Sequence, residues 1–179
     1  MQKKVLILSS SPRIGSNSEL LADRFAQGAS ESGHLVEKIT LRDQQIHFCK
    51  GCLACVKSNR CVIEDDMAWI LGKMKQADVL VFATPVYYYE MRGQMKTLLD
   101  RSNPLYTDTY AFSDIYLIMT AAEDGDHVWK RVVNGLEGWI ECYEKAHLSG
   151  VVFGGGVNGP KEIISHSAMQ KAYEMGKAV

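Results

Sequence analysis

The chain has 179 residues, of which 46% are hydrophobic, and its 20 lysine and arginine residues nearly balance its 21 acidic residues. This length and apolar content predict a single domain over residues 1–179 with one well-filled core. The formal net charge of -1 offers no electrostatic attraction for nucleic acid or an anionic membrane, so small-molecule chemistry is the expected role.

The sequence also predicts the compartment of the protein and the kind of role its cysteines have. No apolar run approaches the roughly 20 residues that cross a bilayer, and Met1–Lys4 leads into a run too short for a signal-peptide core. We therefore expect a cytoplasmic protein. Five cysteines, four of them between Cys49 and Cys61, do not form the disulfide pattern of a small secreted domain. A metal or redox role is the better starting hypothesis.

The first element is a strand that breaks into a hydroxyl-rich turn. Val5–Leu8 is a continuous aliphatic run, as in a strand buried on both faces. Ser16 and Glu19 have the spacing of a capping box, which opens a helix. The unpaired N–H groups and the positive dipole end of that helix favour an anion. The side chains that can donate further hydrogen bonds to it are Ser11, Ser16, Asn17 and Ser18.

The kind of anion is narrowed by motifs that the sequence lacks. There is no G-x-x-x-x-G-K-[ST], which a triphosphate loop needs, and no G-x-G-x-x-G, which marks a dinucleotide pyrophosphate site. A terminal monophosphate remains. The alternative is that this serine-rich loop only caps the helix.

Beyond this turn, helices and strands alternate along the chain. Apolar runs and alternation predict further strands at residues 35–41, 79–83, 115–120 and 148–153. Helical spacing predicts further helices that begin near Asp65 or Asp66, Met91, Gly125, and Pro160 or Lys161. The helix from Gly125 should reach Lys145 and bury Cys142 as a small hydrophobic residue. Residues from about 42 to 65 show no period and are predicted to be a cysteine-rich loop insertion.

Strands separated by helices predict an α/β fold with a doubly wound, five-stranded parallel sheet in the order 2-1-3-4-5, a flavodoxin-like three-layer sandwich. Ligands of such folds bind above the carboxyl ends of the strands, where the strand order reverses. The Ser11 loop should therefore face the loop Pro85–Tyr89.

Three consecutive tyrosines, Tyr87–Tyr89, lie in that second loop. Tyrosine rings beside a phosphate site suit a flat aromatic cofactor, because stacking adds stabilisation beyond burial. Flavin mononucleotide (FMN), with one ring system and one terminal phosphate, has this shape. The alternative is a surface or interface cluster of aromatic residues.

Several segments resemble the flavodoxin-like NAD(P)H-dependent FMN reductases and, within that family, the iron–sulfur flavoproteins most. They are Ser10–Asn17, Cys49–Met67, Ala77–Asp78, Thr84–Tyr87 and Met95–Arg101. The resemblance covers residues 3–101 and is weaker beyond them.

The resemblance implies FMN as cofactor and NAD(P)H as co-substrate. It implies phosphate contacts from Ser11, Arg13, Ser16, Asn17 and Ser18, and ring contacts from Pro85, Val86, Tyr87, Tyr88, Thr120, Ala121 and Ala122. We also expect a homodimer or higher homo-oligomer, because an iron–sulfur cluster on a surface loop would otherwise be open to solvent and Tyr88, Tyr89 and Met91 offer apolar surface for a partner to cover. The expected electron acceptor is a small molecule or a ferredoxin-like protein. No side chain is predicted to be catalytic, because the flavin carries the chemistry.

One loop departs from the family pattern. Where the family is glycine-rich, this chain has Glu123, Asp124 and Asp126 after Ala122. Negative charge close to a flavin would disfavour its anionic reduced form.

The clustered cysteines carry the second chemical signal. A [4Fe–4S] cluster can be held by four cysteines that converge on it. Here they are Cys49, Cys52 and Cys55, which are separated by two residues each, together with Cys61. Four thiolates also satisfy a structural zinc ion, and reduced or oxidised cysteines without metal are a third interpretation. A zinc-stabilised interaction module would leave the phosphate loop unexplained. A response-regulator receiver needs acidic residues where this chain has Ser9 and Thr84.

Overall fold

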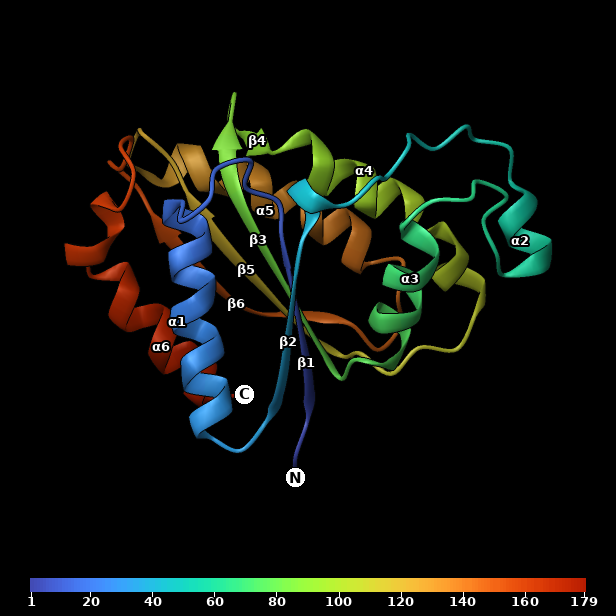
Figure 1. Cartoon of the computed structure of the whole chain (residues 1–179), viewed down its shortest axis with the longest axis horizontal. Helices are drawn as coiled ribbons and strands as arrows, with labels where there is room; N and C mark the ends of the chain where they lie inside the picture. Colours follow the sequence, from blue (N-terminus) through green and yellow to red (C-terminus); the bar gives the residue numbers. More distant parts are fainter.

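The sheet contains five long parallel strands. They are Lys4–Ser9 (β1), Leu35–Thr40 (β2), Val79–Tyr87 (β3), Asp114–Thr120 (β5) and His147–Gly154 (β6). The computed structural model describes residues 1–179 and orders these strands β2-β1-β3-β5-β6 (Figure 1). This is the predicted 2-1-3-4-5 order, so the doubly wound, flavodoxin-like α/β fold is confirmed. A two-residue strand, Glu90–Met91 (β4), pairs antiparallel with β3 and was not predicted.

Helices cover both faces of the sheet. One face carries Asn17–Glu31 (α1) and Ala168–Lys177 (α6), and the other carries Met67–Gln76 (α3), Gly93–Arg101 (α4) and Asp126–Ile140 (α5) (Figure 1). Alternate β1 residues feed the two cores, with Val5 and Ile7 in one and Leu6 and Leu8 in the other. The continuous aliphatic run of β1 is therefore explained by burial on both faces.

Glycines allow α1 and α6 to pack backbone against backbone. A Cβ atom added at Gly28 would lie 2.2 Å from the Tyr173 carbonyl oxygen, and one at Gly176 would lie 2.1 Å from that of Phe25. No side chain fits at either position, so these glycines fix the helix that follows the β1 turn against the C-terminal helix.

Two predicted boundaries in the middle of the chain were wrong. Strand β3 continues through Pro85 to Tyr87, and α4 begins at Gly93 rather than near Met91. The reason is local: Tyr88 and Tyr89 adopt left-handed φ angles of 50° and 64°, which fold the chain back so that Met91 pairs in β4.

The C-terminal third also differs from the prediction. Helix α5 ends at Ile140, and Cys142 is exposed beyond its end rather than buried within it. The last helix begins at Ala168 rather than near Pro160 or Lys161, because Lys161 has a φ of 67° and a short 3₁₀ turn, Glu162–Ser165 (η3), precedes the helix.

The remaining elements are short. Leu41–Asp43 (η1) comes before the cysteine-rich segment, Ala54–Ser58 (α2) lies within it, and Asn103–Thr107 (η2) packs against α2. Helix α2 was not predicted. No helix of the protein combines the length and apolar character needed to cross a membrane.

Candidate functional site

The carboxyl ends of β1, β3 and β5 enclose a cavity of about 210 Å³. Its lining brings together Ser11, Arg13, Ser16, Asn17, Ser18, Pro85, Val86, Tyr87, Thr120, Ala121 and Ala122, with Val157 and Asn158. Of the residues predicted to contact FMN, only Tyr88 lies outside this lining. The cavity occupies the reversal of strand order, where doubly wound folds bind ligands.

The start of α1 supplies hydrogen-bond donors to this cavity. Ser16 Oγ accepts from the Glu19 backbone N–H at 3.2 Å, and Glu19 Oε2 accepts from the Gly15 N–H at 2.8 Å. The capping box is thus present, although its glutamate bonds one residue earlier than usual. The backbone N–H groups of Asn17 and Ser18 have no partner in the chain, and both residues are buried. Unpaired, buried donors at a positive helix end fit a phosphate.

The C-terminal loop closes one side of the cavity. Asn17 Nδ2 donates to the Gly159 carbonyl at 2.9 Å, and Asn17 Oδ1 accepts from the Ile163 N–H at 3.3 Å. Arg13 Nη1 donates to the Asn158 carbonyl at 3.4 Å. The Asn17 side chain is therefore committed to this loop, and its contribution to an anion comes from its backbone. Sequence reasoning missed Asn158 and Val157, although Gly154–Gly156 signalled a turn at this end of β6.

The tyrosine-rich segment forms a hairpin at the rim of the cavity. Tyr87 pairs with Glu90, and the Tyr88 side chain is 99% exposed at the turn. The Tyr89 hydroxyl donates to Glu123 Oε2 at 2.9 Å. A non-glycine residue with positive φ is strained, and this strain persists because strand pairing and the Tyr89 contact hold the turn.

The three acidic residues after Ala122 each have a partner. Glu123 Oε1 lies 2.6 Å from His127 Nε2, Asp126 pairs with Lys130 at 2.8 Å, and Asp124 accepts from the Gly125 N–H at 2.8 Å. Hydrogen bonds from His127 and Tyr89 hold the pKa of Glu123 below its ordinary value. The negative charge expected beside the cofactor is thus partly offset by neighbouring donors and a cation.

Arg92 connects the two loops that face each other, and sequence reasoning missed it. Its Nη1 donates to the Ser10 carbonyl at 2.7 Å, and its backbone N–H donates to Thr84 Oγ1 at 3.0 Å. Arg92 therefore fixes the end of β1 relative to β3. The sequence gives no sign of this contact, because Arg92 follows Met91 of β4 and the hairpin of β3 and β4 was not predicted.

All four clustered cysteines line a second cavity of about 370 Å³. Gly51, with a φ of 64°, bends this segment, and its N–H donates to Cys49 Sγ at 3.4 Å. Asn103 Nδ2 donates to Cys55 Sγ at 3.0 Å. All of the cysteines are free thiols, and no three His, Cys, Asp or Glu side chains are arranged to hold a metal ion. The structure therefore brings the four predicted ligands to one cavity but not into a coordination group.

A buried ion pair lies at the base of the cysteine segment. Arg101 and Asp65 side chains are each 1% exposed and form a two-point contact at 2.7 and 2.9 Å. Burial alone would raise the pKa of Asp65, but hydrogen bonds from Arg101 and from the His47 and Met67 backbone hold it well below its ordinary value. The bond to the Met67 N–H, at 3.1 Å, shows that Asp65 rather than Asp66 caps α3.

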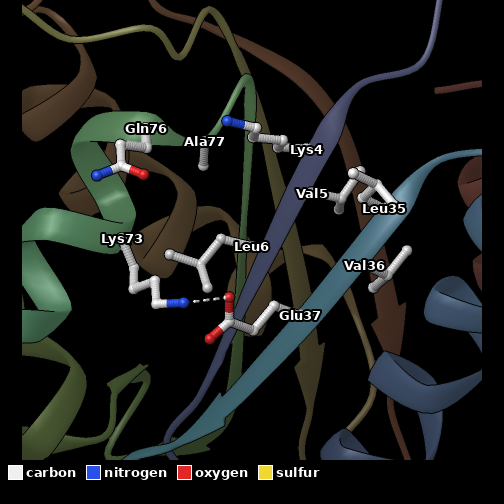
Figure 2. Close-up of a pocket in the computed structure, with 9 residues that line it drawn as sticks. All are labelled: Lys4, Val5, Leu6, Leu35, Val36, Glu37, Lys73, Gln76 and Ala77. Carbon is white, nitrogen blue, oxygen red and sulfur yellow. Dashed lines mark hydrogen bonds and ion pairs between the residues drawn. The ribbon is translucent and has the colours of Figure 1, made fainter.

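Another hollow, of about 320 Å³, lies beside the edge strand and is shown in Figure 2. It is formed by Lys4–Leu6 of β1, Leu35–Glu37 of β2 and the end of α3. Its charged groups include the ion pair between Lys73 and Glu37, at 2.9 Å. It lies at the amino ends of the strands, away from the reversal point, and nothing in it converges on a ligand.

The family model described as NADPH-dependent FMN reductase matches residues 3–154. An iron–sulfur flavoprotein of Methanocaldococcus jannaschii is 40% identical over 102 residues, which are 57% of this chain and 53% of that protein. An iron–sulfur flavoprotein of Methanosarcina thermophila is 27% identical over 157 residues, 84% of this chain and 82% of that protein.

Solved structures share the fold. An NAD(P)H:quinone oxidoreductase from Methanothermobacter marburgensis superposes with a TM-score of 0.75 over 99% of this chain and 96% of that chain, at 17% identity. The chain spans about half the length of several curated relatives that it matches. Because the family model covers most of the sequence, the chain belongs to the NADPH-dependent FMN reductase family.

Proposed function

We propose that this protein is an NAD(P)H-dependent FMN-containing oxidoreductase that passes electrons to a quinone or another small-molecule acceptor. The observation that carries the proposal is the cavity at the strand ends. In it, the unpaired N–H groups of Asn17 and Ser18 face the same space as Tyr87. Membership of the FMN reductase family supports the same cofactor.

The residues present fit FMN in two parts. The buried donors of α1, the Ser11 and Ser18 hydroxyls and the Arg13 charge would hold the phosphate. The cavity, at about 210 Å³, is smaller than the roughly 300–1,000 Å³ of sites that enclose a drug-sized ligand. The ring would therefore rest at the rim against Tyr87, whose side chain is 43% exposed.

The cofactor and the chain would have different roles in the reaction. When bound, FMN would supply the redox chemistry, which is hydride acceptance from NAD(P)H and electron transfer to the acceptor. The chain binds and orients: Arg92 holds the two loops in register, and Glu123 holds Tyr89 and thus the hairpin.

Steady-state oxidation of NADH and NADPH with a benzoquinone acceptor tests this function. Protein stripped of flavin should be inactive, added FMN should restore turnover, and added riboflavin, which lacks the phosphate, should not. Equal rescue by riboflavin would contradict the phosphate site, and no turnover with either nucleotide would contradict the reductase assignment.

The cysteine cavity favours a second function, that of an electron-transfer flavoprotein in which a [4Fe–4S] cluster exchanges single electrons with FMN. The donor set fits a cluster, because four thiols line one cavity and two of their sulfur atoms already accept N–H hydrogen bonds. Relatives named iron–sulfur flavoproteins support it. Cys49, Cys52, Cys55 and Cys61 would be the ligands.

Iron and acid-labile sulfide in anaerobically purified protein test this second function. Cys52→Ser should abolish iron binding and leave FMN bound, because the two cavities share no residue. Protein that holds no iron, or holds zinc that resists exchange, would contradict the cluster. A flavin reduced by ferredoxin but by neither nucleotide would favour the carrier over the reductase.

We also propose a cytoplasmic homodimer or higher homo-oligomer with a small-molecule or ferredoxin-like electron partner and no nucleic-acid or membrane partner. Exposed aromatic side chains at Tyr88 and Phe48 support an interface, because apolar rings on a surface favour contact with a partner. Light scattering of the holoprotein should give at least twice the 20.0 kDa chain mass, and a monomer would contradict this proposal.

A further inference from the structure

The guanidinium of Arg101, on the last turn of α4, holds both ends of the cysteine segment. Its Nη1 donates to the His47 carbonyl at 2.6 Å, and its Nη2 reaches the Ile63 carbonyl at 3.5 Å. His47 precedes the first clustered cysteine and Ile63 follows the last. Asp65 fixes the orientation of the guanidinium through its two-point contact and accepts from the His47 N–H at 2.8 Å.

One donor of this guanidinium is left over. Arg101 Nε is buried and has no hydrogen-bond partner in the chain. The Nη2 of the same guanidinium reaches the Ile63 carbonyl, two residues after Cys61, so the unpaired N–H lies beside the end of the cysteine segment that carries Cys61. A buried N–H without a partner is costly, so a nearby acceptor is the expected explanation for it.

The start of η2, which follows α4, presents a donor to sulfur as well. Asn103, two residues after Arg101, donates to Cys55 Sγ. The Asp100 carboxylate also lines the cysteine cavity, and its charge is paired with Lys96 at 2.5 Å. The α4 end of this cavity is thus equipped with donors for sulfur ligands.

We propose that Arg101 is a positioning residue for the iron–sulfur site: with Asp65 it holds the two ends of the cysteine segment together, and its Nε–H donates to a sulfur of the cluster bound through Cys61. This rests on the [4Fe–4S] function proposed above. The reduced cluster is the more negative form, so a fixed cation and an N–H donor at its sulfur raise its reduction potential.

Arg101→Lys tests both parts, because lysine keeps the charge but loses the fork and the Nε–H. Arg24→Lys, at a half-buried position on α1, which packs on the other face of the sheet, is the control. Metal-free proteins are compared by hydrogen exchange over residues 47–63, and anaerobically reconstituted proteins by cluster reduction potential and by the half-life of iron loss to a chelator. FMN content checks that the remainder of the fold is intact.

Arg101→Lys should exchange residues 47–63 faster, lower the cluster potential and shorten the half-life of iron loss, with FMN content unchanged, while Arg24→Lys behaves as wild type. Exchange and potential equal to wild type in Arg101→Lys would overturn the proposal. If wild-type protein takes up no iron, the proposed cluster function is wrong and there is no cluster reduction potential to compare. Hydrogen exchange over residues 47–63 then still decides whether Arg101 holds the cysteine segment.

Should Arg101→Lys not fold, the double variant Arg101→Met with Asp65→Leu gives the same readouts. It removes both charges together, so neither is left buried alone. Faster exchange and a lower potential in this variant support the proposal, and wild-type values of both overturn it.

Discussion

Individual residues at the start of α1 divide between folding and binding. Ser16 uses its oxygen to accept from the Glu19 N–H, and Asn17 uses its amide to bind Gly159 and Ile163. The sequence predicts Ser16 and Asn17 as phosphate ligands, because spacing shows which groups gather at a helix start but not which are already bonded. Ser18 Oγ has only a 3.5 Å contact with Ser16 Oγ, and the Arg13 guanidinium has a single 3.4 Å contact with Asn158, so these two side chains keep the greater freedom to contact an anion.

Arg13→Ala should weaken FMN binding by about 1.5–3 kcal/mol, because it removes a charge-assisted contact to the phosphate. This corresponds to a roughly ten- to hundredfold higher Kd. Flavin fluorescence titration measures it, with Arg24→Ala, in the middle of α1, as a control. An unchanged FMN affinity would remove Arg13 from the site.

Asn17→Ala and Ser18→Ala should separate the two roles. Asn17→Ala breaks two hydrogen bonds to the C-terminal loop and should lower the free energy of unfolding of the flavin-free protein by about 1–3 kcal/mol. Ser18→Ala should weaken FMN binding with a smaller effect on flavin-free stability. Urea unfolding and FMN titration of both variants check this, and the reverse pattern would contradict the assignment.

Asp65→Asn should change the pH dependence of stability. The folded-state pKa of Asp65 lies below its unfolded value, so its contribution is complete above about pH 4 and is lost as pH falls toward the folded pKa. At pH 7 the variant should lose about 3–5 kcal/mol, because Arg101 stays buried without its partner. Between pH 5 and pH 2, urea unfolding should show the difference from wild type shrinking. A constant difference would contradict the ion pair.

Among the elements, the hairpin of β3 and β4, with Tyr88 and Tyr89 at its turn, cannot be predicted from the sequence. A tight two-residue turn is normally signalled by Asn-Gly or Asp-Gly, whereas here Tyr88 and Tyr89 occupy the left-handed positions. The sequence therefore reads as a loop after a shorter strand. The start of α6 at Ala168 is unpredictable for the same reason, since a lysine at position 161 gives no signal of a positive φ.

Tyr88→Asn should relieve this strain. Asparagine tolerates the left-handed region, and the exposed Tyr88 ring makes little contact, so the flavin-free protein should gain about 1 kcal/mol in free energy of unfolding. FMN affinity should fall two- to tenfold, because the variant loses a ring predicted to stack on the flavin, an interaction worth about 0.5–1.5 kcal/mol. Tyr106→Asn, at another exposed tyrosine, is the control. Lower stability together with unchanged affinity would contradict a role for the strained turn in binding.

At the scale of the whole molecule, the order of the sheet explains why distant segments meet. The loops after β1, β3 and β5 reach one cavity because parallel strands end at the same edge and the order reverses between β1 and β3. This part of the fold is predictable, since aliphatic runs such as Val5–Leu8 mark buried strands. The contribution of Asn158 is not, because it depends on how the chain after β6 returns to α1 through Asn17.

The two cavities occupy different parts of this framework. Figure 1 shows α2, within the cysteine-rich segment, on the opposite side of the molecule from α6, with the carboxyl ends of the strands between them. The cavity at the strand ends is built on the sheet itself, whereas the cysteine cavity is built on a segment held by α4 through Arg101. Loss of the cysteine site should therefore leave the flavin site intact.

The central claim, that FMN bound at the strand ends takes hydride from a nicotinamide nucleotide, is tested most directly by anaerobic stopped-flow absorbance. Mixing the FMN-bound protein with NADPH, or with NADH, should bleach the flavin band at a rate that saturates with nucleotide concentration, and added benzoquinone should restore the band. A flavin band that neither nucleotide bleaches, while reduced ferredoxin does, would contradict the account.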